Sequence, residues 1–146
     1  VQRRLEAALA VSNAGAWRWH VGDGAVEWDA TLRRMHGLPA DGPLTLADVE
    51  SVVHPDDLAR FRAAAERALA GEEPFEIEMR TVARGSDPAA GARWVLDRGE
   101  PLRDPHGRVI GLHGTVLDVT ALVESRRRAE RLQAFTAALS TAGDAE

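Results

Sequence analysis

Hydrophobic and polar residues alternate near the start of the chain with the two-residue period of a β-strand. Residues 17–21 place tryptophan at alternate positions, and residues 25–28 repeat the alternation after the glycine-rich turn at 22–24. Two short alternating runs joined by such a turn predict a β-hairpin.

Three further strands are expected in the second half of the chain. They occupy residues 75–80, 93–97 and 109–119, and each shows strand-like alternation. In the middle one of these strands, Trp94 and Leu96 alternate with their neighbours. We therefore expect Trp94 and Leu96 to face the core.

Helical patterns flank and separate these strands. Leu5 and Leu9 recur at helical spacing within residues 2–12, and the sequence after Thr120 is helical and charged. A block of short helices also separates the hairpin from the later strands. Runs of strands interrupted by such a block predict an α+β fold whose antiparallel sheet is covered by the block.

Capping residues place the helices of this central block. Asp29 is expected to cap the first helix, and Thr45 forms a capping box with Asp48 for the second. Residues 54–57, His-Pro-Asp-Asp, open a longer helix, because proline and carboxylates suit a first turn. We expect the histidine of this segment, His54, to have a capping or loop role.

Composition narrows the possible chemistry. The 146 residues include no cysteine, which excludes disulfides, thiolate metal sites and a flavin–cysteine adduct. All 18 basic residues are arginine, so lysine chemistry such as a Schiff base is excluded. The net charge of −5 argues against a nucleic-acid partner. No apolar run approaches the ~20 residues of a membrane span, and the charged N-terminus is unlike a signal peptide, so we expect a cytoplasmic fragment of a longer protein.

Several short motifs occur in the order typical of one family. They are Gly15-Ala16-Trp17-Arg18-Trp19, Val26-Glu27-Trp28, Met35-His36-Gly37, Val53-His54-Pro55-Asp56-Asp57, Phe75-Glu76-Ile77-Glu78-Met79-Arg80, Arg93-Trp94-Val95, Gly107 and Asp118-Val119-Thr120. Together they resemble a PAS domain of bacterial signalling proteins, over residues 3–120. The resemblance implies a PAS fold, with a five-stranded antiparallel sheet, short helices on one face and an enclosed small cavity. It also implies a sensory or dimerising role without catalysis.

The resemblance divides the chain into three parts. These are an N-terminal amphipathic helix at 1–13, the PAS domain at 14–119 and a C-terminal signalling helix at 120–146. Asp118-Val119-Thr120 resembles the element with which many PAS domains hand over to an output helix. We expect Thr120 to be the N-cap of that helix and Asp118 to add negative charge at its start.

The end of the chain suggests which domain comes after the PAS domain. Residues 132–140 resemble the opening helix of a GAF domain, of the kind found upstream of bacterial serine phosphatases. A histidine kinase is the alternative output domain.

The C-terminal helix carries a weak coiled-coil pattern. Its seam residues recur at alternating three- and four-residue steps and are Leu122, Ser125, Ala129, Leu132, Thr136 and Leu139. A solvated helix packed on its own domain is the alternative. We expect a homodimer that relays a signal to an output domain in the same chain. Its contacts would be made by Leu5, Leu9, Leu122, Leu132 and Leu139.

Four of the seven aromatic residues are tryptophans on predicted strands. These four, Trp17, Trp19, Trp28 and Trp94, either fill the core or help to line a ligand cavity. The candidate cavity residues are Trp17, Trp28, Leu32, Met35, Phe61, Ile77, Met79, Trp94 and Leu112. Because no charged residue is predicted on these inward faces, a small apolar ligand is the expected occupant.

A bound cofactor is the second hypothesis. A haem-binding PAS domain needs an axial histidine beside the cavity. His36 lies beside the helix-ending Gly37 and is expected to be exposed, whereas His54 is expected to have a capping or loop role. We therefore expect no cofactor, no metal and no catalytic residue. A haem- or flavin-binding sensor of redox state, gas or light is the alternative.

Overall fold

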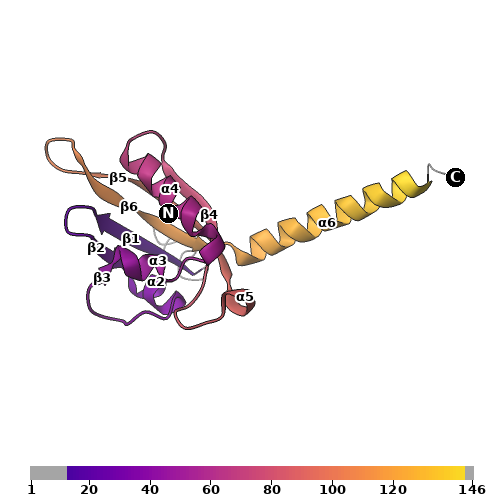
Figure 1. Cartoon of the computed structure of the whole chain (residues 1–146), viewed down its shortest axis with the longest axis horizontal. Helices are drawn as coiled ribbons and strands as arrows, with labels where there is room; N and C mark the ends of the chain where they lie inside the picture. The colour runs from indigo at the N-terminus through magenta and orange to yellow at the C-terminus, as the bar shows by residue number, and fades with distance from the viewer. Residues whose placement is uncertain (1–12, 144–146) are drawn as a thin grey trace, which may run out of the picture.

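The computed structural model describes residues 13–143 as a curved sheet covered by short helices, with one long helix projecting from it (Figure 1). The predicted N-terminal helix, with Leu5 and Leu9, lies outside the described residues. Within residues 13–143, no helix combines the length and the hydrophobicity that crossing a bilayer requires.

The sheet is antiparallel throughout and has six strands. They are β1 (Ala14–His20), β2 (Ala25–Trp28), β3 (Leu44–Thr45), β4 (Phe75–Thr81), β5 (Arg93–Arg103) and β6 (Val109–Asp118), in the spatial order β3-β2-β1-β6-β5-β4. The predicted hairpin is confirmed, with Trp17 opposite Trp28. The prediction of five strands is wrong, because β3 adds a sixth. Two residues are too few to show alternation, so β3 leaves no sequence signal.

The central helices pack on one face of this sheet. They are α2 (Ala30–Met35), α3 (Leu46–Glu50), the single 3₁₀ turn η1 (Pro55–Asp57) and α4 (Leu58–Leu69). The Asp29 carboxylate caps α2 by accepting a hydrogen bond from the Leu32 N–H at 3.0 Å. Thr45 and Asp48 form the expected capping box of α3. The helix signals in the sequence are therefore confirmed.

The set of β5 residues that faces the core is not the set predicted from the sequence. Val95 is fully buried opposite Met79, whereas Trp94 lies opposite Arg80 on the outer face. There the Trp94 ring packs under the Arg80 guanidinium, 5.3 Å from the ring centroid, which gives the aromatic surface a favourable polar cover. The prediction that Trp94 and Leu96 face the core is wrong, because the register with β4 fixes the opposite phase.

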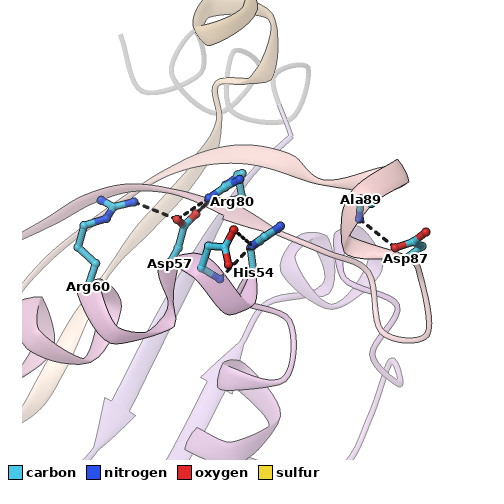
Figure 2. Close-up of polar contacts among 7 residues, drawn as sticks. His54, Asp57, Arg60, Arg80, Asp87 and Ala89 are labelled. Atoms are coloured by element: carbon cyan, nitrogen blue, oxygen red, sulfur yellow. Dashed lines mark hydrogen bonds and ion pairs between the residues drawn. The ribbon is translucent and has the colours of Figure 1, made fainter.

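An acidic residue anchors the start of α4 to the sheet. The Asp57 carboxylate accepts hydrogen bonds from the Arg80 backbone N–H at 2.7 Å and from the Arg80 guanidinium at 2.9 and 3.0 Å (Figure 2). Arg60 approaches the same carboxylate at 3.5 Å. The hydrogen bonds from Arg80 lower the pKa of Asp57 to about 2. Beside this pair, the ring nitrogen Nδ1 of His54 accepts from the Asp56 N–H at 3.1 Å, so the predicted capping role of His54 is confirmed.

The loop at 84–92 contains one further turn of helix. This helix, α5 (Pro88–Gly91), begins after Asp87, whose carboxylate accepts a hydrogen bond from the Ala89 N–H at 2.9 Å (Figure 2). The last helix, α6 (Thr120–Gly143), leaves the domain and extends far beyond the sheet (Figure 1). Its one buried residue is Val123, in the first turn.

Candidate functional site

An apolar cavity lies between the sheet and the helices that cover it. Its volume is about 300 Å³. Strands β1, β2 and β6 form most of its floor, and α3 and α4 form its roof. The apolar lining residues are Trp17, Trp19, Val26, Trp28, Leu46, Val49, Phe61, Ala65, Leu69, Phe75, Leu112 and Val116. A concave site with such a lining is typical of small-molecule binding.

Close packing around one strand position shapes the floor of this cavity. Gly99 on β5 has no side chain, and a Cβ atom there would come within 2.7 Å of the Trp17 ring. The indole therefore lies directly over the β5 backbone and meets Phe75 edge to face, with ring centroids 5.7 Å apart. Phe61 of α4 also packs edge to face on Phe75, at 6.1 Å between ring centroids.

Three buried polar atoms in the cavity lining have no hydrogen-bond partner within the described residues. They are the indole Nε1 atoms of Trp17 and Trp19 and the Oδ1 atom of Asp97. Asp97 is only 7% exposed. Burial raises the pKa of Asp97 to about 8, and the Trp17 indole N–H opposes this rise in part, because it lies beside the carboxyl group although it does not reach full hydrogen-bond geometry. Unsatisfied buried polar atoms are rare in folded proteins, so three of them in residues that line one cavity make it the candidate ligand site.

Charged side chains stand around the cavity on the helical side. Glu50 comes from α3, and Arg62 and Glu66 come from α4. The Arg62 Nε atom donates a hydrogen bond to the Glu50 carboxylate at 2.7 Å, and this ion pair links α4 to α3. The charges of the roof are thus partly neutralised. Within residues 13–143, Arg62 is the one positive side chain of the cavity lining, and it is already paired.

The structure divides the predicted cavity residues into three groups. Trp17, Trp28, Phe61 and Leu112 line the cavity. Leu32, Met35, Ile77 and Met79 belong to the buried core beside it. Trp94 lies on the opposite face of the sheet, so its predicted place among the cavity residues is wrong.

Asp97 is the important residue that sequence reasoning misses. A strand with Trp94 and Leu96 pointing inward would place Asp97 on the outer face. The phase of β5 brings Asp97 inward instead, opposite Ile77 and Val116. Val95, Asp97 and Gly99 share the buried face, because residues two positions apart point to the same side of a strand, and no local pattern distinguishes this face from that of Trp94 and Leu96.

The histidines differ from expectation at one position. His36 is only 2% exposed, so its predicted exposure is wrong. Its Nδ1 atom lies 2.9 Å from the Leu32 carbonyl oxygen and its Nε2 atom 2.9 Å from the Thr81 hydroxyl. Burial lowers the pKa of His36, which favours the neutral imidazole. The two contacts of the ring connect the end of α2 with Thr81 of β4.

The residues present do not fit an axial site for haem. Haem iron in proteins is held by histidine, cysteine, methionine or tyrosine side chains. The chain has no cysteine or tyrosine, and the cavity lining within residues 13–143 contains neither histidine nor methionine. Both ring nitrogens of the nearby His36 are already engaged.

The junction with α6 is built by the Asp118-Val119-Thr120 segment. The Asp118 carboxylate accepts from the Thr120 N–H at 2.9 Å and from Arg93 at 3.2 Å. The Thr120 hydroxyl accepts from the Trp94 backbone N–H at 3.0 Å. The predicted N-cap role of Thr120 is therefore wrong: Asp118 provides the cap, and Thr120 ties the helix to β5.

Two side-chain contacts continue this attachment along α6. Arg126 forms an ion pair with Glu78 of β4. The Arg127 guanidinium packs on Trp94, 4.7 Å from the ring centroid. Trp94 thus contacts both Arg80 and Arg127, and Arg80 in turn holds Asp57 at the start of α4. These contacts connect the roof of the cavity with the base of α6.

Comparison with known proteins identifies the class to which this fold belongs. The family described as PAS fold matches residues 25–116, and the chain belongs to this family. Sensor protein FixL of Bradyrhizobium diazoefficiens is 28% identical over 105 residues, which cover 72% of this chain and 20% of FixL. Phytochrome E of Ipomoea nil is 27% identical over 93 residues, 64% of this chain and 8% of the phytochrome. The chain thus spans a fifth or less of these curated relatives.

Solved structures give the same result. A sensory box histidine kinase/response regulator from Burkholderia thailandensis has a TM-score of 0.68 and 26% identity, covering 93% of this chain and 97% of that one. The N-terminal domain of a diguanylate cyclase with a PAS/PAC sensor, from Marinobacter aquaeolei, has a TM-score of 0.62. At 20% identity over 74% of this chain and 96% of that one, it supports the fold alone. The chain is a PAS sensory domain related to those of histidine kinase sensors.

Proposed function

We propose that this domain is a non-catalytic sensory module of a cytoplasmic bacterial signalling protein. It binds a small, largely apolar molecule in the cavity and passes the binding event through α6 to an output domain of the same polypeptide. The observation that carries this proposal is the apolar cavity with three unpaired buried polar atoms in its lining. The relationship with sensor proteins such as FixL supports the sensory role.

The contacts at the sheet suggest how binding is relayed. A ligand that moves α4 acts on Asp57, which is held by Arg80, and Arg80 shares the Trp94 ring with Arg127 of α6. A shift of β5 acts on the same ring directly, because Asp97 and Trp94 lie on opposite faces of this strand. Ligand binding would thus change the packing of α6 on Trp94 and with it the orientation of α6.

A cavity-filling variant tests ligand binding. We expect the purified protein to be colourless, without a Soret or flavin band, and to release a small apolar molecule on extraction with organic solvent. Ala65→Phe should abolish the extracted molecule, because Ala65 lines the cavity and a benzyl group would occupy it. Mass spectrometry of the extracts measures the loss. Ala59→Phe, on the exposed side of α4, is the matched control and should retain the molecule.

Two results would contradict the proposal. A visible cofactor band in the protein purified from cells would favour the haem- or flavin-binding alternative. Equal amounts of extracted molecule from the parent and Ala65→Phe would place that molecule outside the cavity.

We propose further that α6 joins two copies of the chain as a parallel coiled coil. Leu122, Leu132 and Leu139 of the predicted seam are between 58% and 66% exposed, as is the neighbouring Phe135. Four exposed large apolar side chains on one projecting helix are typical of a surface that a partner covers. The seam is weak, since Ser125 and Thr136 are polar, and a weak seam allows a change of register or rotation.

Light scattering tests the dimer. We expect the parent protein to dimerise at high micromolar concentration and the double variant Leu132→Asp, Leu139→Asp to be monomeric, because two charges would be buried in the seam. The double variant Ala134→Asp, Ala138→Asp places the same charges away from the seam and should dimerise like the parent. A monomeric parent, or a seam variant that dimerises normally, would contradict the coiled coil.

A further inference from the structure

The unpaired polar atoms of the cavity restrict the chemistry of its ligand. Each indole N–H can only donate a hydrogen bond. The two buried indoles of Trp17 and Trp19 therefore require acceptors. Within the described residues, the Trp17 N–H lies beside the Asp97 carboxyl group without full hydrogen-bond geometry, and the Trp19 N–H has no protein acceptor. A purely apolar molecule would fill the cavity but would leave both donors unsatisfied, which costs free energy in a buried site.

Asp97 adds a third donor. The charged groups that line the same cavity are Glu50 of α3 and Arg62 and Glu66 of α4. Arg62 is paired with Glu50, so the lining within residues 13–143 supplies no free cation to balance an Asp97 carboxylate. Burial therefore keeps this carboxyl group protonated at neutral pH, in which form its O–H donates a hydrogen bond.

The same arrangement argues against a charged ligand. An anion would enter a cavity with two glutamates at its roof and, among the described residues, without an unpaired positive side chain in its lining. A cation would have to ionise the buried Asp97, which burial opposes, and would supply no acceptor for the Trp19 indole N–H. An uncharged molecule with an acceptor oxygen satisfies the Trp19 and Asp97 donors without placing a charge in the cavity.

From this geometry we propose that the cavity binds an uncharged, largely apolar molecule bearing carbonyl oxygen, such as a ketone, lactone or quinone. The two lone pairs of its oxygen accept hydrogen bonds from the Trp19 indole N–H and from the Asp97 carboxyl group, beside which the Trp17 N–H lies, while the aromatic walls hold the apolar part of the ligand. This inference rests on the proposed ligand-binding function and specifies the class of ligand.

A matched series of probes tests the class. Acetophenone, ethylbenzene, benzylamine and benzoate share one phenyl ring and differ in their polar group. Each is titrated alone at neutral pH against the full chain, and the indole N–H resonances are followed by NMR. We expect acetophenone to bind at least about tenfold more tightly than ethylbenzene, and both charged probes to bind more weakly than acetophenone. The indole signals of Trp17 and Trp19 should move most.

Variants assign the preference to the named atoms. Asp97→Leu and Trp19→Phe should each reduce the advantage of acetophenone over ethylbenzene several-fold while ethylbenzene still binds. Trp94→Phe, on the other face of the sheet, should leave the advantage unchanged. Because the comparison of the four probes uses the parent protein, it decides the question even if a cavity variant fails to fold.

The outcomes separate this inference from the proposed function. Tighter binding of benzylamine than of acetophenone would overturn the carbonyl class and make Asp97 a counter-ion. Equal affinities for acetophenone and ethylbenzene would also overturn it, while leaving an apolar ligand site intact. If none of the four probes binds up to its solubility limit, both this inference and ligand binding in the cavity fail.

Discussion

Replacement of Asp97 by asparagine is expected to abolish a large loss of stability that the parent domain suffers as the pH rises from about 4 to about 8. In the folded protein the pKa of Asp97 is raised to about 8 by burial, whereas an unfolded chain has a pKa near 3.9 for this group. Between these two values the folded state holds a proton that the unfolded state has released. The free energy of unfolding therefore falls as the pH rises through this window.

The size of this effect depends on the width of the window. One pKa unit corresponds to about 1.4 kcal/mol, so the shift of Asp97 amounts to roughly 5 kcal/mol once the pH exceeds about 8. Such a loss is comparable to the whole stability of a marginal domain. The amide introduced by Asp97→Asn has nearly the same size as the carboxyl group but cannot ionise, so the variant should not show this loss.

Urea unfolding at about pH 5 and about pH 9 measures the difference between the two proteins. His36 acts in the opposite direction, because its lowered pKa removes stability as the pH falls below about 6.5. That contribution is common to the parent and the variant and cancels in the comparison. Asp41→Asn, in an exposed loop, is the control and should follow the parent. An equal pH dependence for the parent and Asp97→Asn would show that Asp97 is ionised in the folded state.

Truncation of Met79 to alanine is expected to lower the free energy of unfolding by about 2–5 kcal/mol. Met79 is 3% exposed and belongs to the core cluster beside the cavity, together with Leu32 and Phe61. Removing its side chain beyond Cβ loses the transfer free energy of those atoms and leaves a void that the rigid sheet cannot close. Truncation of Trp28, which is half-buried, should lower the free energy of unfolding by less than truncation of a fully buried aromatic residue.

Denaturant unfolding of Met79→Ala at neutral pH provides the measurement. Glu76→Ala, three positions earlier on β4, removes an exposed side chain from the outer face and should change stability by less than about 1 kcal/mol. If Met79→Ala unfolded at the same denaturant concentration as the parent, the strand phase of β4 would be incorrect, because a slip of one residue would expose this side chain.

Local signals in the sequence are sufficient for most elements of the fold. The hairpin of β1 and β2 is predicted by alternation on both sides of a glycine-rich turn. The starts of α2 and α3 are predicted by Asp29 and by the pair of Thr45 and Asp48, since a cap depends only on atoms within a few residues. The ordered motifs indicate the PAS family, and the match over residues 25–116 confirms it.

The side of the sheet on which each side chain lies is harder to predict from the sequence. Alternation gives the period of a strand but not which of its two sets of residues is buried. In β5 both sets contain large apolar residues, and the choice depends on its partners: Val95 lies opposite Met79, and Trp94 lies opposite Arg80. Trp94 is stabilised on the outer face by two guanidinium groups from elements distant in the sequence, which no local pattern reveals.

The sequence by itself thus determined the α+β class, the hairpin, the capped helices, the family and part of the predicted cavity lining, because these depend on local patterns. Only the tertiary structure decided the short strand β3, the burial of His36 and the inward position of Asp97. Each of these depends on pairing between strands or packing between segments far apart in the chain. The chemistry of the cavity belongs to this second group, because it depends on Asp97 of β5 and the indoles of β1 lining the same largely apolar space.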